Sequence, residues 1–497
     1  MGAKRRARLV AAGALVAGLG AIGFAPGCID SSPEQTLDGA VGFDVLVPDA
    51  GLSFDSAAPP DATLPADAGG DATLPVDSSV PDASGVDSSV PPGDASEDAA
   101  PPVDASDAAA DAEPPVDAGA DAAAGSVTSG AHQLSSFRQG HSATLLANGH
   151  VLLCGGYYGS SASQASCDDF DPATSTFSSN VSMIVGRQGH AAVPLASGQV
   201  LFAGGAGTND AGAFDALRSA EIYDPAKGTF TLVSHSMTQG RSAVNGVALT
   251  AGANAGKAVL VGGYGDSTYD SGTPNDPSLD TAEVFDPGTD PTTGTFTLLS
   301  AHLSARRGGS MTAQPLPEGG LLAAGGSFGP GGGPYTYLDT ADTLDPALSK
   351  FTATNNAMSV ARQGAQSVTL QDGRVFVFGG YTAGFAYAPT ADLYDPATGS
   401  FTSIALPNPR AYAAVALLKS GRVLIAGGVG TTDAGFATFG DLIVYDPQEN
   451  AFLPVSGALN PPRSLATATT LTDGRVLIAG GQTAGGPITT AVDIFTE

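Results

Sequence analysis

Two histidines occupy matching positions in neighbouring sequence repeats and could share a metal ion. His141 follows Arg138 by three residues, and His190 follows Arg187 by three. Imidazoles on adjacent strands are suitable ligands for zinc or copper. The corresponding positions later in the chain hold Ala, Val, Ser or Gly, and no third ligand stands out. We therefore predict packed or solvated histidines, no metal and no other cofactor.

Aromatic and acidic residues gather in long segments of variable length that follow seven Gly-Gly pairs. Functional residues are commonly carried on such loops, and rings beside carboxylates suit a sugar or a peptide. The alternative is that these loops vary because nothing restrains them. The candidate ligand-binding residues are Tyr157, Tyr158, Tyr264, Tyr269, Asp270, Tyr335, Tyr337 and Tyr387.

Motifs for covalent chemistry are missing from the sequence. It contains no G-x-S-x-G nucleophile motif, no Cys–His pair and no phosphate-binding loop. The acids of 264–280 do not have the spacing of a calcium loop, so we expect solvated loop acids there. No catalytic residue is predicted.

An arginine opens each repeat, and in six repeats an acid stands two residues before a later aromatic or Leu. Both fall at the same end of the repeat, which predicts buried ion pairs rather than a ring of arginines that binds anions. Binding of an acidic ligand by some of these arginines is the alternative. Clear examples are Arg187 with Glu221, Arg241 with Glu283 and Arg362 with Asp392.

Cys154 and Cys167 are the cysteines that remain beyond the N-terminal region. Cys154 precedes a Gly-Gly pair and Cys167 begins the next strand of the same repeat. Adjacent strands in an exported protein favour a disulfide. Two buried free thiols are the alternative.

The elements that carry these residues come from one repeated unit. GRVLIAGG occurs at 421–428 and again at 474–481, and weaker copies bring the total to seven. The first glycines are spaced by about 54 residues on average, a period typical of propellers and solenoids. Each unit contains four short apolar segments separated by turn residues such as Asp-Gly and Asp-Pro, which predicts four β-strands. We number the units 1 to 7 in chain order.

The pattern resembles the kelch repeat: an opening Arg, Gly-Gly after the second strand, Tyr-Asp-Pro after the third and an aromatic residue in the fourth. Phe stands where kelch units usually have Trp. The resemblance covers 125–497 and implies an all-β, seven-bladed β-propeller of four-stranded blades, like the central domain of galactose oxidase. Sugar oxidases with this fold use copper, two Tyr, two His and a Cys–Tyr link, and no such set can be placed in this sequence.

The two ends of the repeat region complement each other. Unit 7 stops after its third strand, at AVDIFTE, whereas GSVTSGAHQLSSFR at its start matches a fourth strand and lead-in. We therefore expect the segment near 126–129 to complete the last blade and so remove a sheet edge.

The N-terminal region is typical of an exported lipoprotein. Basic residues precede the apolar run LVAAGALVAGLGAIGF and then Cys28, which resembles a bacterial lipobox, so residues 1–27 are predicted to be a signal peptide and Cys28 to carry lipid. An ordinary cleaved signal is the alternative. Residues 28–124 contain 21 acids and no Lys or Arg, which predicts a disordered Asp/Ala/Pro-rich linker.

The formal net charge of −29 argues against nucleic acid and against electrostatic docking on anionic lipid. We expect a non-enzymatic propeller that binds a protein or a glycan, anchored by lipid at the outer membrane or cell surface, and monomeric. The alternatives are a carbohydrate-active enzyme of the sugar oxidase or isomerase type and a purely structural surface protein.

Overall fold

Short β-strands, most of them four to seven residues long, make up the structure, a computed structural model that describes residues 123–159, 162–269, 276–330 and 334–497. In these ranges the remaining regular elements are two 3₁₀ turns, η2 (Pro291–Thr293) and η3 (Ala383–Phe385). None of the described elements is a helix of the length and hydrophobicity that a bilayer requires. The predicted signal peptide and linker, 1–27 and 28–124, lie almost entirely outside the described residues.

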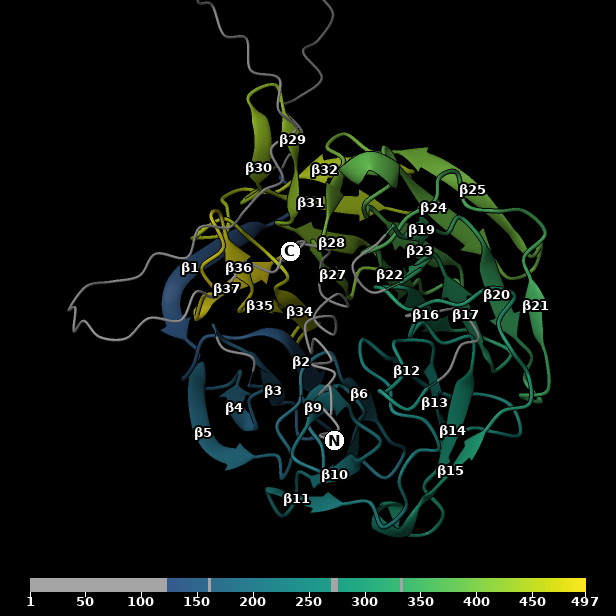
Figure 1. The fold of residues 1–497 in the computed structure, drawn as a ribbon. Coiled ribbons are helices and arrows are strands. Elements are labelled where there is room, and N and C mark those ends of the chain that lie inside the picture. The colour runs from purple at the N-terminus through teal and green to yellow at the C-terminus, as the bar shows by residue number, and fades with distance from the viewer. Residues whose placement is uncertain (1–122, 160–161, 270–275, 331–333) are drawn as a thin grey trace, which may run out of the picture. The chain divides into compact units, whose positions relative to one another are not determined.

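Seven antiparallel sheets of four strands are formed by the described residues (Figure 1). The first three are β2 (Gln139–Leu145), β3 (Val151–Tyr157), β4 (Ser166–Asp171) and β5 (Thr176–Ser182); β6 (Ala191–Pro194), β7 (Val200–Ala203), β10 (Ala220–Asp224) and β11 (Thr229–Leu232); β12 (Asn245–Ala248), β13 (Ala258–Val261), β14 (Ala282–Asp286) and β15 (Thr295–Leu298). The next three are β16 (Thr312–Pro315), β17 (Leu321–Ala324), β20 (Ala341–Leu344) and β21 (Phe351–Ala353); β22 (Gln366–Thr369), β23 (Val375–Phe378), β24 (Thr390–Asp395) and β25 (Ser400–Ala405); β27 (Ala414–Leu417), β28 (Val423–Ala426), β31 (Leu442–Asp446) and β32 (Ala451–Pro454).

The remaining four-stranded sheet combines both ends of the described chain. It contains β34 (Thr467–Thr470), β35 (Val476–Ala479), β37 (Ala491–Thr496) and β1 (Ser126–Gln133). β1 pairs antiparallel with β37, from Ser126 opposite Thr496 to Gln133 opposite Ala491, and its register shifts between Ser129 and His132.

Smaller sheets are formed by the loops after the Gly-Gly pairs, in two cases together with an opening-arginine segment. They are β8 (Ala206–Thr208) with β9 (Phe214–Ala216); β18 (Ser327–Phe328) with β19 (Thr336–Tyr337); β26 (Arg410–Ala411), β29 (Val429–Thr432) and β30 (Gly435–Thr438); and β33 (Arg463–Ser464) with β36 (Gln482–Thr483). We call the side of the sheets that carries these loops the long-loop face.

The innermost strands of successive sheets contact one another around a common centre (Figure 1). In chain order they are β2, β6, β12, β16, β22, β27 and β34, and β34 also contacts β2. The first strand of each unit is therefore central and the fourth is peripheral.

The Gly-Gly pairs join neighbouring sheets. The second glycine amide of one unit donates to the arginine carbonyl of the next, for example Gly156 to Arg187 at 3.0 Å, and the last, Gly481, donates to Arg138 at 3.1 Å. Both glycines have positive φ, +71° and +87° in the first pair. A Cβ on the first glycine would run into the neighbouring arginine carbonyl, so the close approach requires glycine.

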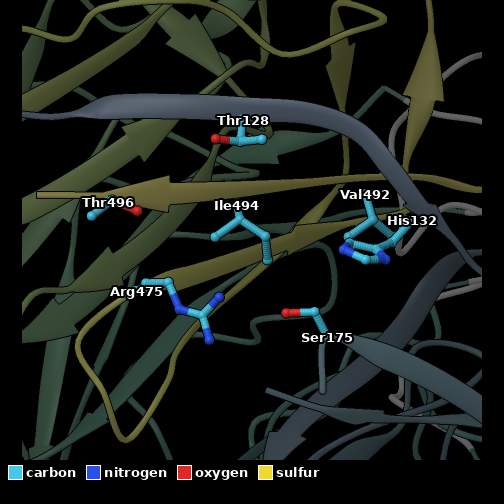
Figure 2. Close-up of a pocket in the computed structure, with 7 residues that line it drawn as sticks. All are labelled: Thr128, His132, Ser175, Arg475, Val492, Ile494 and Thr496. Carbon is cyan, nitrogen blue, oxygen red and sulfur yellow. The ribbon is translucent and has the colours of Figure 1, made fainter. Parts of the chain in front are cut away.

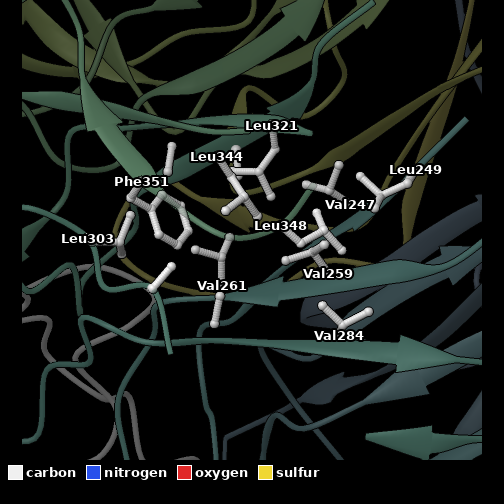
Figure 3. Packing of buried hydrophobic residues seen from close by; sticks show 14 of the residues in the cluster. Val247, Leu249, Val259, Val261, Val284, Leu303, Leu321, Leu344, Leu348 and Phe351 are labelled. Atoms are coloured by element: carbon white, nitrogen blue, oxygen red, sulfur yellow. The ribbon is translucent and has the colours of Figure 1, made fainter. Parts of the chain in front are cut away.

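Hydrophobic clusters fill the spaces between sheets. Figure 3 shows one of them, in which Val247, Val259 and Val261 of unit 3 pack against Leu321 and Leu344 of unit 4. Equivalent clusters lie between each of the other consecutive units. One more joins Leu477 and Val492 of unit 7 to Val151 and Phe170 of unit 1. Burial on both faces explains why the second strand of each unit, such as β7 (VLFA) and β13 (AVLV), is almost wholly apolar.

The all-β expectation is confirmed, and the antiparallel sheets are consistent with a β-propeller. The kelch assignment, the number of blades and the closure of the ring are considered under the proposed function.

Candidate functional site at the long-loop face

The opening arginines are buried in ion pairs within their own sheets. Arg187 Nη2 lies 2.7 Å from Glu221 Oε1, and both side chains are fully buried. Glu221 also accepts hydrogen bonds from the amides of Ile184 and Val185, and Arg187 Nη1 donates to the carbonyl of Gly204. Burial lowers the pKa of the Arg187 guanidinium, and Glu221 opposes that shift. These contacts use most of the donors that an anionic ligand would need.

The same arrangement recurs around the molecule. The pairs are Arg138–Asp168 (2.7 Å), Arg241–Glu283 (3.3 Å), Arg307–Asp342 (2.7 Å), Arg362–Asp392, Arg410–Asp441 (2.8 Å) and Arg463–Asp493 (2.5 Å). Asp441 differs from the others because its side chain is 45% exposed.

Cys154 and Cys167 lie opposite each other on β3 and β4 and are joined by a disulfide. Both are buried in the cluster between units 1 and 2. Neither sulfur is therefore a free thiol.

The two repeat histidines are packed among strands. His141 Nε2 lies 3.1 Å from Thr467 Oγ1, and His190 Nε2 lies 2.9 Å from Ser142 Oγ. Burial lowers the pKa of each imidazole to about 3, and the neighbouring arginine adds to the effect. Both rings are therefore neutral at pH 7.

Tyr264 is the first residue after the Gly-Gly pair of unit 3, and its side chain lies across the start of unit 4. A Cβ on Gly309 would stand 2.6 Å from the Tyr264 hydroxyl, 2.8 Å from Ser327 Oγ and 3.2 Å from Gln363 Oε1. Three side-chain oxygens from three successive units therefore surround one α-carbon. Ser327 Oγ donates to Gln363 Oε1 at 2.7 Å.

An extra residue in unit 4 makes room for this ring. Met311, which packs on the preceding Gly-Gly pair, stands four positions after Arg307, whereas His190 stands three positions after Arg187. The amides of Gly308 and Gly309 both donate to the Ser327 carbonyl, at 2.9 and 3.2 Å. The result is a bulge with two side-chain-free residues beneath the tyrosine.

Tyr412 approaches the same place from unit 6. Its backbone has a φ of +54°, and its ring lies over Gly364, where an added Cβ would be 2.7 Å from Cε1. Burial raises the pKa of Tyr412, while the nearby Ser310 hydroxyl opposes the rise. Burial also raises the pKa of Tyr264, and Tyr335 and Tyr412 add to that shift.

Two further tyrosines of unit 5 complete the group. The ring centroid of Tyr381 lies 4.9 Å from that of Tyr387 and 5.4 Å from that of Tyr412. We call Tyr264, Tyr381, Tyr387 and Tyr412, with their floor of Gly308, Gly309 and Gly364, the tyrosine site. Half-buried Tyr335 and Tyr337 interact electrostatically with Tyr264 and Tyr381, respectively.

The structure distributes the predicted loop residues over more than one place. It brings together Tyr264, Tyr335, Tyr337 and Tyr387, whereas Tyr157 bonds to Gln139 and Tyr158 stacks on Phe137. Tyr269 is half-buried and interacts electrostatically with Asp280, Arg306 and Asp276. Asp270 and Cys28 lie outside the described residues.

Two members of the tyrosine site were missed by the sequence reasoning. Tyr381 follows its Gly-Gly pair directly, as Tyr157 and Tyr264 do, so an alignment of the units could have found it. Tyr412 stands two residues after Arg410, at a position that looks like the start of a strand, and the sequence gives no sign of its left-handed backbone.

A cavity of about 230 Å³ lies elsewhere, beside the strands that join the two ends of the described chain (Figure 2). It is lined by Thr128, His132, Ser175, Arg475, Val492, Ile494 and Thr496. The Arg475 guanidinium is engaged with Asp473 and with the carbonyl of Pro172.

Neutral hydroxyls beside aromatic rings can hold a ligand that has both hydroxyl groups and apolar C–H surface. The raised pKa values of Tyr264 and Tyr412 keep both hydroxyls protonated, so each can donate a hydrogen bond. Asp276, whose side chain pairs with Arg306 at 3.3 Å, is in electrostatic contact with Tyr264.

A solved structure is similar in fold to this chain. It is a fungal alcohol oxidase, described as having catalytic diversity among the AA5 family and as being in complex with copper. The sequences are 16% identical over 75% of this chain and 76% of the oxidase, and the TM-score is 0.55. No family profile and no curated protein sequence matches the chain. The likeness shows a shared fold.

This finding corrects the expectation of a non-enzymatic binding propeller. The fold is shared with a solved enzyme, so the fold does not favour a non-enzymatic role. Copper itself does not fit the residues: in the described ranges no three His, Cys, Asp or Glu side chains are grouped to hold a metal ion, and the two cysteines are bonded to each other. No reaction step is therefore derived through copper.

Proposed function

We propose that the described domain, 125–497, is a seven-bladed kelch-type propeller closed by its N-terminal strand. In support, each space between consecutive units contains a hydrophobic cluster, including the space between units 7 and 1. The Gly481–Arg138 hydrogen bond repeats the bond made at the six other junctions. β1 supplies the fourth strand that unit 7 lacks in its own sequence.

We propose further that this propeller is a carbohydrate-active enzyme whose substrate binds at the tyrosine site. The supporting observation is that Tyr264 of unit 3 and Tyr412 of unit 6 interact electrostatically, and that each ring packs on glycines without side chains. The hydroxyls of these rings match the hydroxyl groups of a sugar. Binding sites of this kind combine apolar walls with a few placed polar groups.

The two hydroxyls would have the role of hydrogen-bond donors to sugar oxygens. Tyr264 is positioned by the bulge of unit 4 and by Ser327, and Tyr412 by Gly364. We favour the isomerase type of carbohydrate-active enzyme over the oxidase type, because the described residues do not match the copper set.

The test is a turnover assay with the mature chain and its Tyr→Phe variants. A panel of neutral mono- and oligosaccharides is followed by proton NMR for new isomers and by a peroxidase-coupled assay for peroxide. We expect isomer formation, slowed at least tenfold by Tyr264→Phe and by Tyr412→Phe, and unchanged by Tyr445→Phe, whose hydroxyl bonds to Asn450 away from the site. Equal rates in all variants, or no product from any sugar, would refute the proposal.

For the N-terminal region we propose export, lipid attachment at Cys28 and display at the outer membrane or cell surface on the linker 28–124. The supporting features are the basic start, the apolar run and the cysteine that follows it. After expression in a bacterial host and detergent phase separation, the wild-type protein should enter the detergent phase, whereas Cys28→Ser should stay in the aqueous phase. Identical partitioning of the two would contradict lipid attachment. We propose a monomer, which size-exclusion chromatography tests.

A further inference from the structure

Phe137 and Tyr158 form an exposed stack of two rings on the long-loop face of unit 1. Their centroids lie 4.7 Å apart with 19° between the planes. Phe137 is 41% exposed and Tyr158 is 51% exposed. Among the ring pairs that the described residues form, this is the one in which both rings remain largely open to solvent. We infer that this pair is a second binding platform, for a pyranose unit of a neutral oligosaccharide, separate from the tyrosine site.

The two rings are held in place by their neighbours. The Phe137 carbonyl accepts a hydrogen bond from Gln164 Nε2 at 2.9 Å, and Ser136 Oγ donates to Gln164 Oε1 at 3.0 Å. The residue after Phe137 is buried Arg138, and the residue before Tyr158 is Tyr157, whose hydroxyl is bonded to Gln139. Anchored residues therefore flank each ring. A surface fixed before binding loses little conformational entropy when a ligand arrives.

The side chains that hydrogen-bond beside the stack are polar and uncharged. Gln164 and Ser136 lie beside the rings, and the nearest cation in sequence, Arg138, is fully buried against Asp168. This composition does not suit an anionic ligand, which would need an accessible cation. It suits a pyranose, because the C–H face of the sugar is apolar and its rim carries hydroxyls that amides and hydroxyls can bind.

The platform lies on the same face as the tyrosine site. Tyr157 occupies in unit 1 the position that Tyr264 and Tyr381 occupy in units 3 and 5, directly after the Gly-Gly pair. The next residue, Tyr158, projects instead to the outer stack. A substrate held at both places would be a chain of several sugar units rather than a monosaccharide. The class of ligand rests on the proposed function, whereas the location of the platform does not.

The test is affinity electrophoresis of the mature chain through gels that contain a neutral polysaccharide. The probes are a galactomannan, a xyloglucan, a mixed-linkage β-glucan and a dextran. We expect at least one to retard the wild type, and Phe137→Ala and Tyr158→Ala to lose at least tenfold in affinity. Tyr158→Phe should retain binding because the stack persists. Phe436→Ala is the matched control, since Phe436 is 57% exposed on β30, outside unit 1.

Turnover measured beside retardation separates this inference from the proposed function. Tyr445→Phe, whose hydroxyl bonds to Asn450, should be retarded like the wild type. Retardation without turnover of any sugar would support the platform and refute the enzyme. Failure of every polysaccharide to retard the wild type would overturn the inference, and so would retardation of Tyr158→Ala equal to that of the wild type.

Discussion

The amide of Gly481 donates a hydrogen bond to the carbonyl of Arg138, 3.1 Å away, although these residues belong to the last and the first repeat. Gly481 has a φ of +100°, and an added Cβ would lie 2.8 Å from the Ala466 amide nitrogen. We predict that Gly481→Ala lowers the free energy of unfolding by about 2 kcal/mol or more, because it adds both backbone strain and a clash. Urea unfolding followed by circular dichroism measures the loss.

Gly485→Ala is the matched control for this substitution. Gly485 also has a positive φ, +80°, but no atom lies within 4 Å of the position of its Cβ. Its loss should therefore be restricted to backbone strain, about 1 kcal/mol. An equal loss in the two variants would mean that the junction between units 7 and 1 contributes nothing beyond local strain.

The sequence was sufficient to predict the β-class, because each recurring position of the repeat, such as Gly-Gly and Asp-Pro, has a local physical cause. Gly-Gly permits a close approach of backbones, and Asp-Pro begins a tight turn in which, for example, Asp171 Oδ1 accepts the Ala173 amide. Repetition multiplies such weak signals. An irregular unit is harder to read: unit 6 has no acid two residues before Tyr445, and its arginine pairs with Asp441 instead.

That irregular pair provides the second prediction. Glu221→Gln leaves the fully buried Arg187 guanidinium without a compensating charge, and the free energy of unfolding should fall by about 3–5 kcal/mol. Asp441→Asn should cost less than about 1 kcal/mol, because solvent screens its half-exposed carboxylate. Urea unfolding of both variants gives the comparison, and similar losses would show that burial does not determine the value of these pairs.

The tyrosine site could not be predicted from sequence because it depends on positions in space that no local pattern encodes. Tyr264 and Tyr412 belong to different units and meet only after the sheets are arranged around a centre. The extra glycine of unit 4 is visible in the sequence. Its role, which is to leave space for the Tyr264 ring, is seen only in the structure. Loop composition indicated the correct face and four of the six tyrosines that gather there.

The third prediction concerns acid stability. The pKa of His141 and of His190 in the folded protein is about 3, below the ordinary value of 6.5. Between pH 3 and pH 6.5 the unfolded chain therefore binds more protons than the folded protein. Stability that is complete above pH 6.5 should therefore fall as the pH approaches 3, by up to about 1.4 kcal/mol per pH unit for each histidine. His190→Gln should flatten the dependence of urea midpoints on pH.

His302→Gln is the control for the acid series, because the His302 side chain is 55% exposed beside Asp280. It should leave the slope of stability against pH unchanged. A slope that His302→Gln and His190→Gln alter to the same extent would contradict the assignment to the buried ring.

The fourth prediction concerns alkaline pH. Burial raises the pKa of Tyr264, Tyr381 and Tyr412 furthest among the 12 tyrosines, so the folded protein keeps protons that the unfolded chain releases above pH 10. Stability should be complete below that pH and decline as the pH rises. In a spectrophotometric titration at 295 nm, these hydroxyls should ionise only as the chain unfolds, and Tyr264→Phe should reduce the amplitude of that late phase. If all tyrosines ionised in a single phase, at the pH midpoint measured for the guanidinium-unfolded chain, the three hydroxyls would be exposed to solvent. That result would remove the basis for assigning them as protonated hydrogen-bond donors in the tyrosine site.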